Sequence, residues 1–458
     1  MLRSARRAPV LAAPVLAALA LVLAAAASPA AAQEGPATGA VRARDLGVAI
    51  AGEPGRWNAI TDVPGVEVGL VTLVEGDGPL IEGSGPVRTG VTAILPRGKD
   101  DMGPVFAGHF SLNGNGEMTG TVWLEETGEL VGPVTITSTS TVGVVRDAVY
   151  GWVAARVPEV PFTLPVTAET LDFPLNDVNG QHVTKAHALE ALNGARGGPV
   201  AEGNVGGGTG MICHWFKGGT GTASRVLRPE QGGYAVGVLV QCNYGRRSRL
   251  RIDGVPVGEA IADLTPCRSL PAEEVSPMIA RVPACEGTPD RSGDRGAAAP
   301  AETDLEETAP AEAGPGAASW LAALEEALAG TPLDPGAGSI IVVVATDAPL
   351  LPSQLRRVAK RVSLGVGRMG GLGENSSGDI FLAFSTAPVQ ADDLGLWHLT
   401  AVESDRMNPI FEAVVQATEE AIVNALVAAE TMTGADGFRV HELPHDRLRR
   451  MMNTTERK

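Results

Sequence analysis

Short apolar runs rich in β-branched residues alternate along this chain with longer segments in which apolar residues recur at helical spacing. Six segments have the composition of β-strands, at residues 67–76, 91–98, 134–141, 234–243, 339–346 and 379–386. Helical spacing occurs at residues 142–157, 183–195, 353–366 and 408–434. These patterns predict an α/β protein.

Two of the predicted strands, at residues 340–345 and 380–384, are apolar throughout and do not alternate. A strand of this kind is buried on both faces of its sheet. Each predicted helix has only one apolar stripe to bury. The arrangement that satisfies both conditions has four layers, in the order helix, sheet, sheet, helix.

Residues 1–32 have the composition of a secretory signal. Three arginines in the first seven residues precede an Ala-rich apolar stretch, and small residues offer a cleavage site after Ala32. A permanent membrane anchor is the alternative, but the stretch is only weakly apolar, which favours removal. No later segment has the unbroken apolar length of a membrane helix. We therefore expect a secreted or periplasmic protein without a stable membrane anchor.

The formal net charge of the 458-residue chain is −17, which argues against a nucleic-acid partner. Residues 266–338 contain 13 acidic and 4 basic residues, a net charge of −9. The stretch 286–318 within them is rich in Pro, Ala and Gly, and has too little apolar surface to offset the entropy of ordering. We interpret 266–338 as an acidic insert in a single domain that spans residues 33–458. A short helical pattern follows at 318–330.

The four cysteines leave their pairing open. Cys213 and Cys242 stand in apolar surroundings, whereas Cys267 and Cys285 flank the start of the acidic insert. Export would allow a disulfide between Cys267 and Cys285. Four free thiols are the alternative, and the spacing does not decide between them.

Two familiar motifs occur in unsuitable contexts. The sequence "HELPH" at 441–445 matches a zinc motif that requires a helix, but Pro444 lies inside the required turn. We expect its two histidines to be solvated tail residues. The sequence "GVGRMG" at 365–370 matches a dinucleotide-binding pattern that requires a preceding strand. It follows a helical pattern instead, and we interpret it as a loop of structural glycines.

Ser339 stands alone between the loose segment that ends at Gly338 and the apolar strand. A Gly-Ser pair in this position is usually a turn. If the peptide bond between the two residues is cut, however, Ser339 carries a free α-amine with a pKa of about 7.7–8 beside its own hydroxyl. Nucleophile and base then come from one residue. Attack by this hydroxyl on the unhindered Gly338 carbonyl would make the cut.

Long stretches of the chain resemble the L-aminopeptidase/D-Ala-esterase (DmpA-like) family of self-processing hydrolases, which includes the β-aminopeptidases. The resemblance covers residues 43–265 and 338–445. It is carried by "NAITDVPGVEVG", "LNGNGEMTG", "VGVVRDAV", "AET", "LNDVNG", "GGGTGMICHWFKGGTGTASR", "GVLVQCNYGRRSRLRIDGVPVG", "GSIIVVVATDAPLLPSQLRR" and "ENSSGDIFLAFST". It implies an αββα sandwich similar to N-terminal-nucleophile hydrolases, cleaved at Gly338–Ser339 into chains 33–338 and 339–458 that stay together, usually in a homotetramer of processed heterodimers.

The same resemblance implies roles for particular residues. Ser339 would be the nucleophile, and Ser377 and Asp379 would orient groups and relay protons. Asn243 would stabilise the oxyanion, a contribution often worth several kcal/mol. Glu169 would receive the free amino group of the substrate. One departure is Leu171, which stands where an aromatic residue, often a tyrosine, is expected.

We therefore expect a serine aminopeptidase that releases N-terminal residues from small peptides, amides or esters through an acyl-enzyme on Ser339. This chemistry requires no metal or organic cofactor. One alternative is an amidase or acyltransferase that acts on a non-peptide acyl group, which Leu171 keeps open. The other is a catalytically silent binding protein on the same fold. The sequence leaves open the preference for L-, D- or β-amino acids.

Overall fold

The computed structural model describes residues 41–159, 162–288, 338–389 and 391–455. The predicted signal at 1–32, the helical pattern at 318–330 and most of the acidic insert lie outside these ranges. None of the helices in the described ranges is both long enough and apolar enough to cross a membrane.

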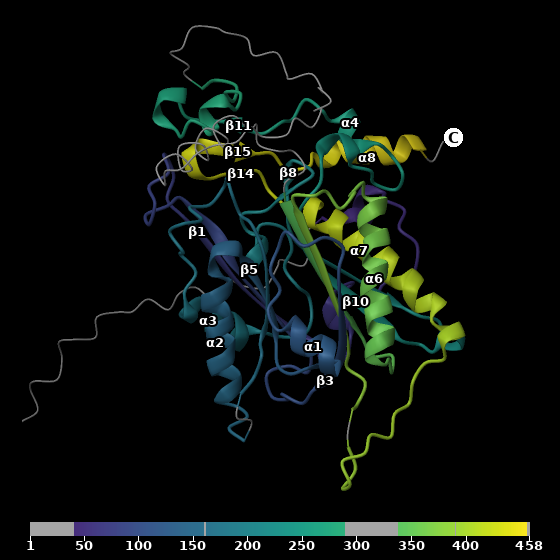
Figure 1. The fold of residues 1–458 in the computed structure, drawn as a ribbon. Coiled ribbons are helices and arrows are strands. Elements are labelled where there is room, and N and C mark those ends of the chain that lie inside the picture. Colours follow the sequence, from purple (N-terminus) through teal and green to yellow (C-terminus); the bar gives the residue numbers. More distant parts are fainter. Residues whose placement is uncertain (1–40, 160–161, 289–337, 390, 456–458) are drawn as a thin grey trace, which may run out of the picture.

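Two sheets form the centre of the molecule (Figure 1). The first sheet has the strand order β1-β2-β5-β6, and its last two strands are parallel. Its strands are β1 (Glu67–Glu75), β2 (Val87–Leu95), β5 (Val134–Ser138) and β6 (Val166–Thr170). The second sheet has the order β4-β3-β13-β12-β10-β9, with β12 and β13 parallel. Its strands are β4 (Glu129–Leu130), β3 (Val105–Ser111), β13 (Ser377–Ser385), β12 (Gly338–Thr346), β10 (Ala235–Asn243) and β9 (Gly219–Val226).

Helices cover the outer face of each sheet, which completes four layers. Helices α2 (Val142–Ala154) and α3 (Lys185–Gly194) pack on the first sheet. Helices α6 (Pro352–Arg368) and α7 (Asn408–Val427) pack on the second sheet. In Figure 1 the two helix pairs stand on opposite sides of the sheets. The predicted αββα sandwich is therefore confirmed.

Strand β12 shows why the apolar runs do not alternate. Its residues Ile340, Val342 and Val344 belong to the cluster packed against α6 and α7. Ile341 and Val343 belong to the cluster between the two sheets. Because successive side chains point to opposite faces, a central strand in a four-layer protein must be apolar at every position.

Smaller elements close one end of the sandwich. Strand β7 (Ile212–Cys213) forms a hairpin with β8 (Phe216–Lys217). Strand β15 (Phe438–Val440) lies between β11 (Cys267–Arg268) and β14 (Met432–Thr433) in a three-stranded sheet. Within the described residues, the other α-helices are α1 (Thr121–Thr127), α4 (Val257–Ala260) and α8 (His445–Thr455).

Several predicted boundaries were wrong. The helix expected at 408–434 ends at Val427, and residues 432–433 form β14 instead. The glycine pattern at 365–370 is not a loop at its start, because α6 continues to Arg368. The strand expected at 134–141 ends at Ser138.

The expectations for the acidic insert and for the two late histidines also need correction. Residues 266–288 are part of the fold, since Cys267 and Arg268 pair with β15. His441 and His445 are half-buried rather than solvated. Nε2 of His445 lies 2.7 Å from the carbonyl oxygen of Val427, the last residue of α7.

Candidate active site

Ser339 lies at the start of the central strand of the second sheet. It is opposite Asn243 of β10 on one side and opposite Gly378 of β13 on the other. The backbone N–H of Gly378 donates a hydrogen bond of 3.1 Å to Oγ of Ser339. Only 6% of Ser339 is exposed. The hydroxyl therefore accepts a hydrogen bond from the main chain of the neighbouring strand β13.

Gly338, the residue before it, has a backbone that only glycine accommodates. Its φ is +153°, and a Cβ atom added here would lie 2.1 Å from the carbonyl oxygen of Asn243. The register also places Gly338 beside Ser377. The bond between Gly338 and Ser339 therefore lies directly between β10 and β13.

Ser377 and Asp379 form a hydrogen-bonded pair on β13. Oγ of Ser377 donates to Oδ1 of Asp379 at 2.6 Å. Oδ1 of Asn113 accepts from the backbone N–H of Asp379 at 2.6 Å, and Nδ2 of Asn113 lies 3.4 Å from Oδ2 of Asp379. Burial raises the pKa of Asp379, and the hydrogen bonds from Ser377 and Asn113 oppose that rise.

The pair and the Ser339 side chain occupy opposite faces of the sheet. Ser377 and Asp379 share the face of Phe381, which packs toward α6 and α7. Ser339 shares the face of Ile341, toward the first sheet. In the strand register Ser377 is opposite Gly338, the residue whose peptide bond to Ser339 would be cut.

Asn243 is fixed at both ends of its side-chain amide. Its Oδ1 accepts from the backbone N–H of Ile212 at 2.7 Å. Its Nδ2 donates to the carbonyl oxygen of Leu171 at 2.8 Å. Asn243 is 5% exposed. The amide therefore presents its N–H groups, and not its oxygen, on the side of Leu171.

Glu169 lies on β6 of the other sheet and reaches the site through the loop at 112–120. Its Oε1 accepts from the backbone N–H of Glu117 at 2.8 Å, and the hydroxyl of Thr139 donates to Oε2. An added Cβ at Gly116 would lie 3.2 Å from both Oε1 of Glu169 and Cα of Gly378. Glu169 is thus close to the residue that holds Ser339. Its burial raises the pKa of the carboxyl.

The structure places Ser339 and Asn243 on paired strands and Glu169 near Gly378, whereas the Ser377–Asp379 pair lies on the other face of the sheet from the Ser339 side chain. Leu171 follows β6, is 41% exposed, and contributes its carbonyl oxygen rather than its side chain to Asn243. Cys267, on β11 of the small three-stranded sheet, is joined to Cys285 by a disulfide with a Cα–Cα distance of 5.0 Å.

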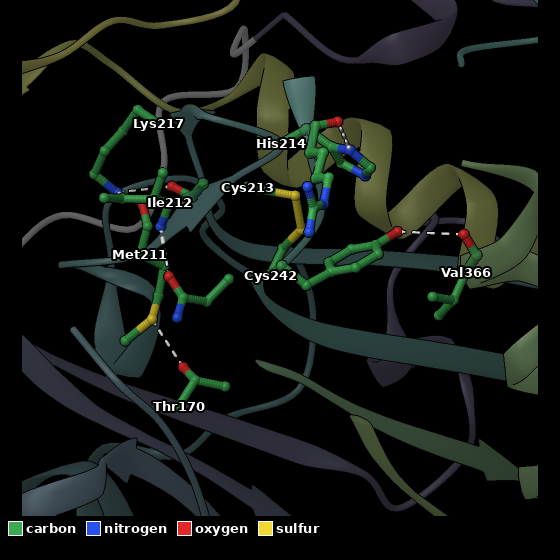
Figure 2. The surroundings of a disulfide bond; sticks show 12 residues. Thr170, Met211, Ile212, Cys213, His214, Lys217, Cys242 and Val366 are labelled. Carbon is green, nitrogen blue, oxygen red and sulfur yellow. Dashed lines mark hydrogen bonds between the residues drawn. A yellow bond between two sulfur atoms is a disulfide. The ribbon is translucent and has the colours of Figure 1, made fainter. Parts of the chain in front are cut away.

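The sequence analysis missed three supporting features. Asn113 lies within the block "LNGNGEMTG", but no role was predicted for it. Cys213 and Cys242 form a second disulfide, which joins the β7–β8 hairpin to the end of β10 beside Asn243 (Figure 2). Lys217 is a fully buried lysine on the same hairpin. A polar side chain in the block after "GGGTG" was the available signal for Lys217.

Among the described residues there is no group of three or more His, Cys, Asp or Glu side chains that could hold a metal ion. The site consists instead of hydroxyl, amide and carboxyl groups around a Gly-Ser bond. Such a set can carry out nucleophilic acyl transfer, since it contains a held hydroxyl, a fixed amide donor and a buried carboxylate.

Residues 58–440 match Peptidase family S58. The chain belongs to this family. Beta-peptidyl aminopeptidase BapA of Sphingosinicella microcystinivorans is 51% identical over 427 residues, which are 93% of this chain and 93% of that protein.

Two solved structures place this S58 member among aminopeptidases. A β-aminopeptidase of Burkholderia sp. is 41% identical, with a TM-score of 0.68 over 90% of this chain and 99% of that one. The L-aminopeptidase D-Ala-esterase/amidase of Ochrobactrum anthropi, described as a prototype serine aminopeptidase with a variant of the Ntn hydrolase fold, is 39% identical. Its TM-score is 0.71 over 91% of this chain and 99% of that one. The predicted family, the hydrolase class and the aminopeptidase function are confirmed.

Proposed function

We propose that this S58 member is a self-processing aminopeptidase in which Ser339 is the nucleophile and the substrates are peptides and amides with an N-terminal β-amino acid. The observation that carries the proposal is the position of Ser339, held by Gly378 and opposite Asn243, directly after a residue that must be glycine. The β-amino acid preference is drawn from the relatives, whose names describe β-peptidyl substrates.

Self-processing would begin with attack of Ser339 Oγ on the carbonyl carbon of Gly338. The C–N bond to Ser339 breaks, the acyl group moves to Oγ as an ester, and the nitrogen leaves as a free amine. Water then hydrolyses the ester and releases the Gly338 carboxylate. The hydrogen bond from the Gly378 N–H supports this step, because it leaves the hydroxyl proton of Ser339 free to be transferred.

Turnover would use the same hydroxyl on an external acyl group. The new α-amine, with a pKa of about 7.7–8 in its unperturbed state, takes the proton from Oγ. The pairing of Gly338 with Ser377 in the strand register supports a relay of that proton through the Ser377–Asp379 pair. Nδ2 of Asn243 would donate to the oxyanion in place of the Leu171 carbonyl.

Glu169 would bind the ammonium group of the substrate. A buried carboxylate that has lost its hydration needs a cationic partner. It therefore favours substrates with a free N-terminal ammonium group over substrates in which that group is blocked. Leu171 leaves an apolar, half-exposed side chain at the edge of the site, where it would contact the side chain of the released residue.

Export and assembly belong to the same proposal. A signal at residues 1–32 would direct the chain to the periplasm or outside the cell. The pairing of all four cysteines into two disulfides supports an oxidising compartment. The processed chains, 33–338 and 339–458, would stay together and assemble into a homotetramer.

The decisive experiment compares the wild-type chain with Ser339→Ala. Wild type should mature into two chains, the smaller of 120 residues beginning Ser-Ile-Ile-Val, and should hydrolyse β-aminoacyl anilides faster than L- or D-aminoacyl anilides. Ser339→Ala should remain one chain without activity. Ser363→Ala, a change to a half-buried serine on α6, is the matched control and should behave as wild type.

Three results would each remove a different part of the proposal. Activity in Ser339→Ala would exclude the nucleophile. A single active wild-type chain would exclude self-processing. Preferred hydrolysis of α-aminoacyl anilides, or of non-peptide acyl groups only, would exclude the substrate class and leave the fold and nucleophile in place.

A further inference from the structure

Lys217 is a fully buried lysine without a carboxylate partner among the described residues. It stands at the end of β8, and its exposed fraction is 0%. Its Nζ donates to the carbonyl oxygen of Met211 at 2.9 Å; Figure 2 labels both residues. It also donates to the carbonyl oxygen of Gly218 at 2.8 Å. A buried ammonium without a counter-charge is costly, so its presence calls for a reason beyond folding.

The contact with Met211 leads through one peptide group to Asn243. The Met211 carbonyl oxygen accepts from both Lys217 Nζ and the Gly218 N–H, each at 2.9 Å. The N–H on the other side of the same peptide group belongs to Ile212. It donates to Oδ1 of Asn243 at 2.7 Å. An unbroken series of hydrogen bonds therefore joins the lysine to the amide of Asn243.

This series determines which end of the Asn243 amide faces the site. A cation on a carbonyl oxygen polarises the peptide group and makes its N–H a stronger donor. A strong donor at Oδ1 holds the asparagine oxygen in place, so that its Nδ2 must point to the other side. It also draws electron density toward Oδ1, which makes the Nδ2–H₂ group a better donor.

The hairpin that carries Lys217 is attached to β10 at neighbouring points. The Cys213–Cys242 disulfide joins the residue after Ile212 to the residue before Asn243. The His214 N–H donates to the Tyr244 carbonyl at 2.7 Å. These links keep the peptide group of Met211 and Ile212 in contact with Asn243, so that the effect of the lysine is transmitted through a fixed geometry.

We propose that Lys217 is a positioning residue for the aminopeptidase reaction, which acts through the peptide group between Met211 and Ile212 to orient and polarise the oxyanion-stabilising amide of Asn243. The inference rests on the proposed function, in which Asn243 donates to the oxyanion. Burial lowers the pKa of Lys217 to about 7, which agrees with a charge that the surroundings stabilise only through dipoles.

The test is a double-mutant cycle on the full-length enzyme, with Lys217→Met and Asn243→Ala alone and together. Loss of an oxyanion donor costs about 100- to 1,000-fold in kcat. Loss of its polarisation should cost less, so we expect Lys217→Met to lower kcat about 5- to 10-fold with KM unchanged. In the Asn243→Ala background the same substitution should have almost no effect, because its target is gone.

Two more variants separate positioning from a general structural role. Lys217→Gln keeps a neutral donor of similar reach and should recover part of kcat. Lys99→Met is the matched control and should leave kcat unchanged, since the Nζ of Lys99 donates to the Asn193 carbonyl oxygen near the surface. Lys217→Met should unfold at the same temperature as wild type or higher, since it removes an unpaired buried charge.

All values are expressed per processed chain, and the same cycle is applied to the rate at which the 120-residue chain appears. Equal losses from Lys217→Met with and without Asn243 would overturn the inference, as would an unchanged kcat or a loss confined to KM. In each of those cases an inactive Ser339→Ala would still uphold the proposed function. Activity in Ser339→Ala would instead remove the proposed function itself.

Discussion

Substitution of Gly338 by alanine tests whether the conformation before the cut is required for self-processing. In the intact chain, a Cβ at this position would lie 2.1 Å from the carbonyl oxygen of Asn243, where ordinary contacts are at least 3.4 Å. Strands β12 and β10 would have to separate by more than about 1 Å. A displacement of about 1 Å at a reacting group can lower a rate about 100-fold.

Backbone strain acts in the same direction. A φ of +153° is rarely adopted by residues with side chains, and such conformations cost about 1–3 kcal/mol. That free energy corresponds to a further factor of about 5 to 150. We therefore expect Gly338→Ala to process at least about 100-fold more slowly than wild type.

The assay follows the appearance of the 120-residue chain over time by denaturing electrophoresis and intact-mass measurement. Gly395→Ala is the matched control, because this glycine also has a positive φ, +74°, but has no atom within 4 Å of the added Cβ. It should process at the wild-type rate. Those Gly338→Ala molecules that do mature should have a normal kcat, since residue 338 is then a free chain end.

Processing of Gly338→Ala within about two-fold of the wild-type rate would refute this reasoning. It would mean that β12 and β10 part before the chemical step, so that the geometry of the uncut strand does not limit the reaction.

Three further outcomes are expected. Glu169→Gln should raise KM for substrates with a free amine about 10- to 100-fold, with a smaller change in kcat. Because burial raises the pKa of Glu169, the KM of the wild type should already increase on mild acidification, and a KM that does not change with pH would contradict this. The double substitution Cys213→Ala and Cys242→Ala removes a disulfide between residues 29 positions apart, so the free energy of unfolding should fall by about 3.5 kcal/mol. An unchanged denaturant midpoint would show that this disulfide does not stabilise the fold. Burial raises the pKa of Asp172 to about 6, so the folded state holds an extra proton between about pH 4 and pH 6, and this stabilisation is lost as the pH rises through 6. In chemical denaturation, the free energy of unfolding of Asp172→Asn should therefore exceed that of wild type by up to about 3 kcal/mol at pH 8 and should equal it near pH 4. The same difference at both pH values would exclude this carboxyl as the cause.

The sequence by itself determined the layered architecture. Strands β12 and β13 are apolar at successive positions because both of their faces are covered, and that requirement is written into the residues themselves. The helices α2, α3, α6 and α7 are evident from the same kind of local pattern. Glycine-rich β9 was not predicted, because its composition is set by a neighbour. A Cβ at Gly221 would lie 2.1 Å from the Ala421 carbonyl of α7, so the close approach of the helix excludes typical strand residues.

The candidate site residues were also named from the sequence, through the family resemblance, but their geometry was not. Ser339, Asn243 and Glu169 are far apart along the chain, and motif resemblance could name them without placing them. Only the strand register puts Gly338 between Asn243 and Ser377, and only the alternation of β13 places the Ser377–Asp379 pair across the sheet from the Ser339 side chain. The role that we propose for Lys217 could not be read from the local sequence, because it depends on hydrogen bonds between segments that meet only in the folded protein.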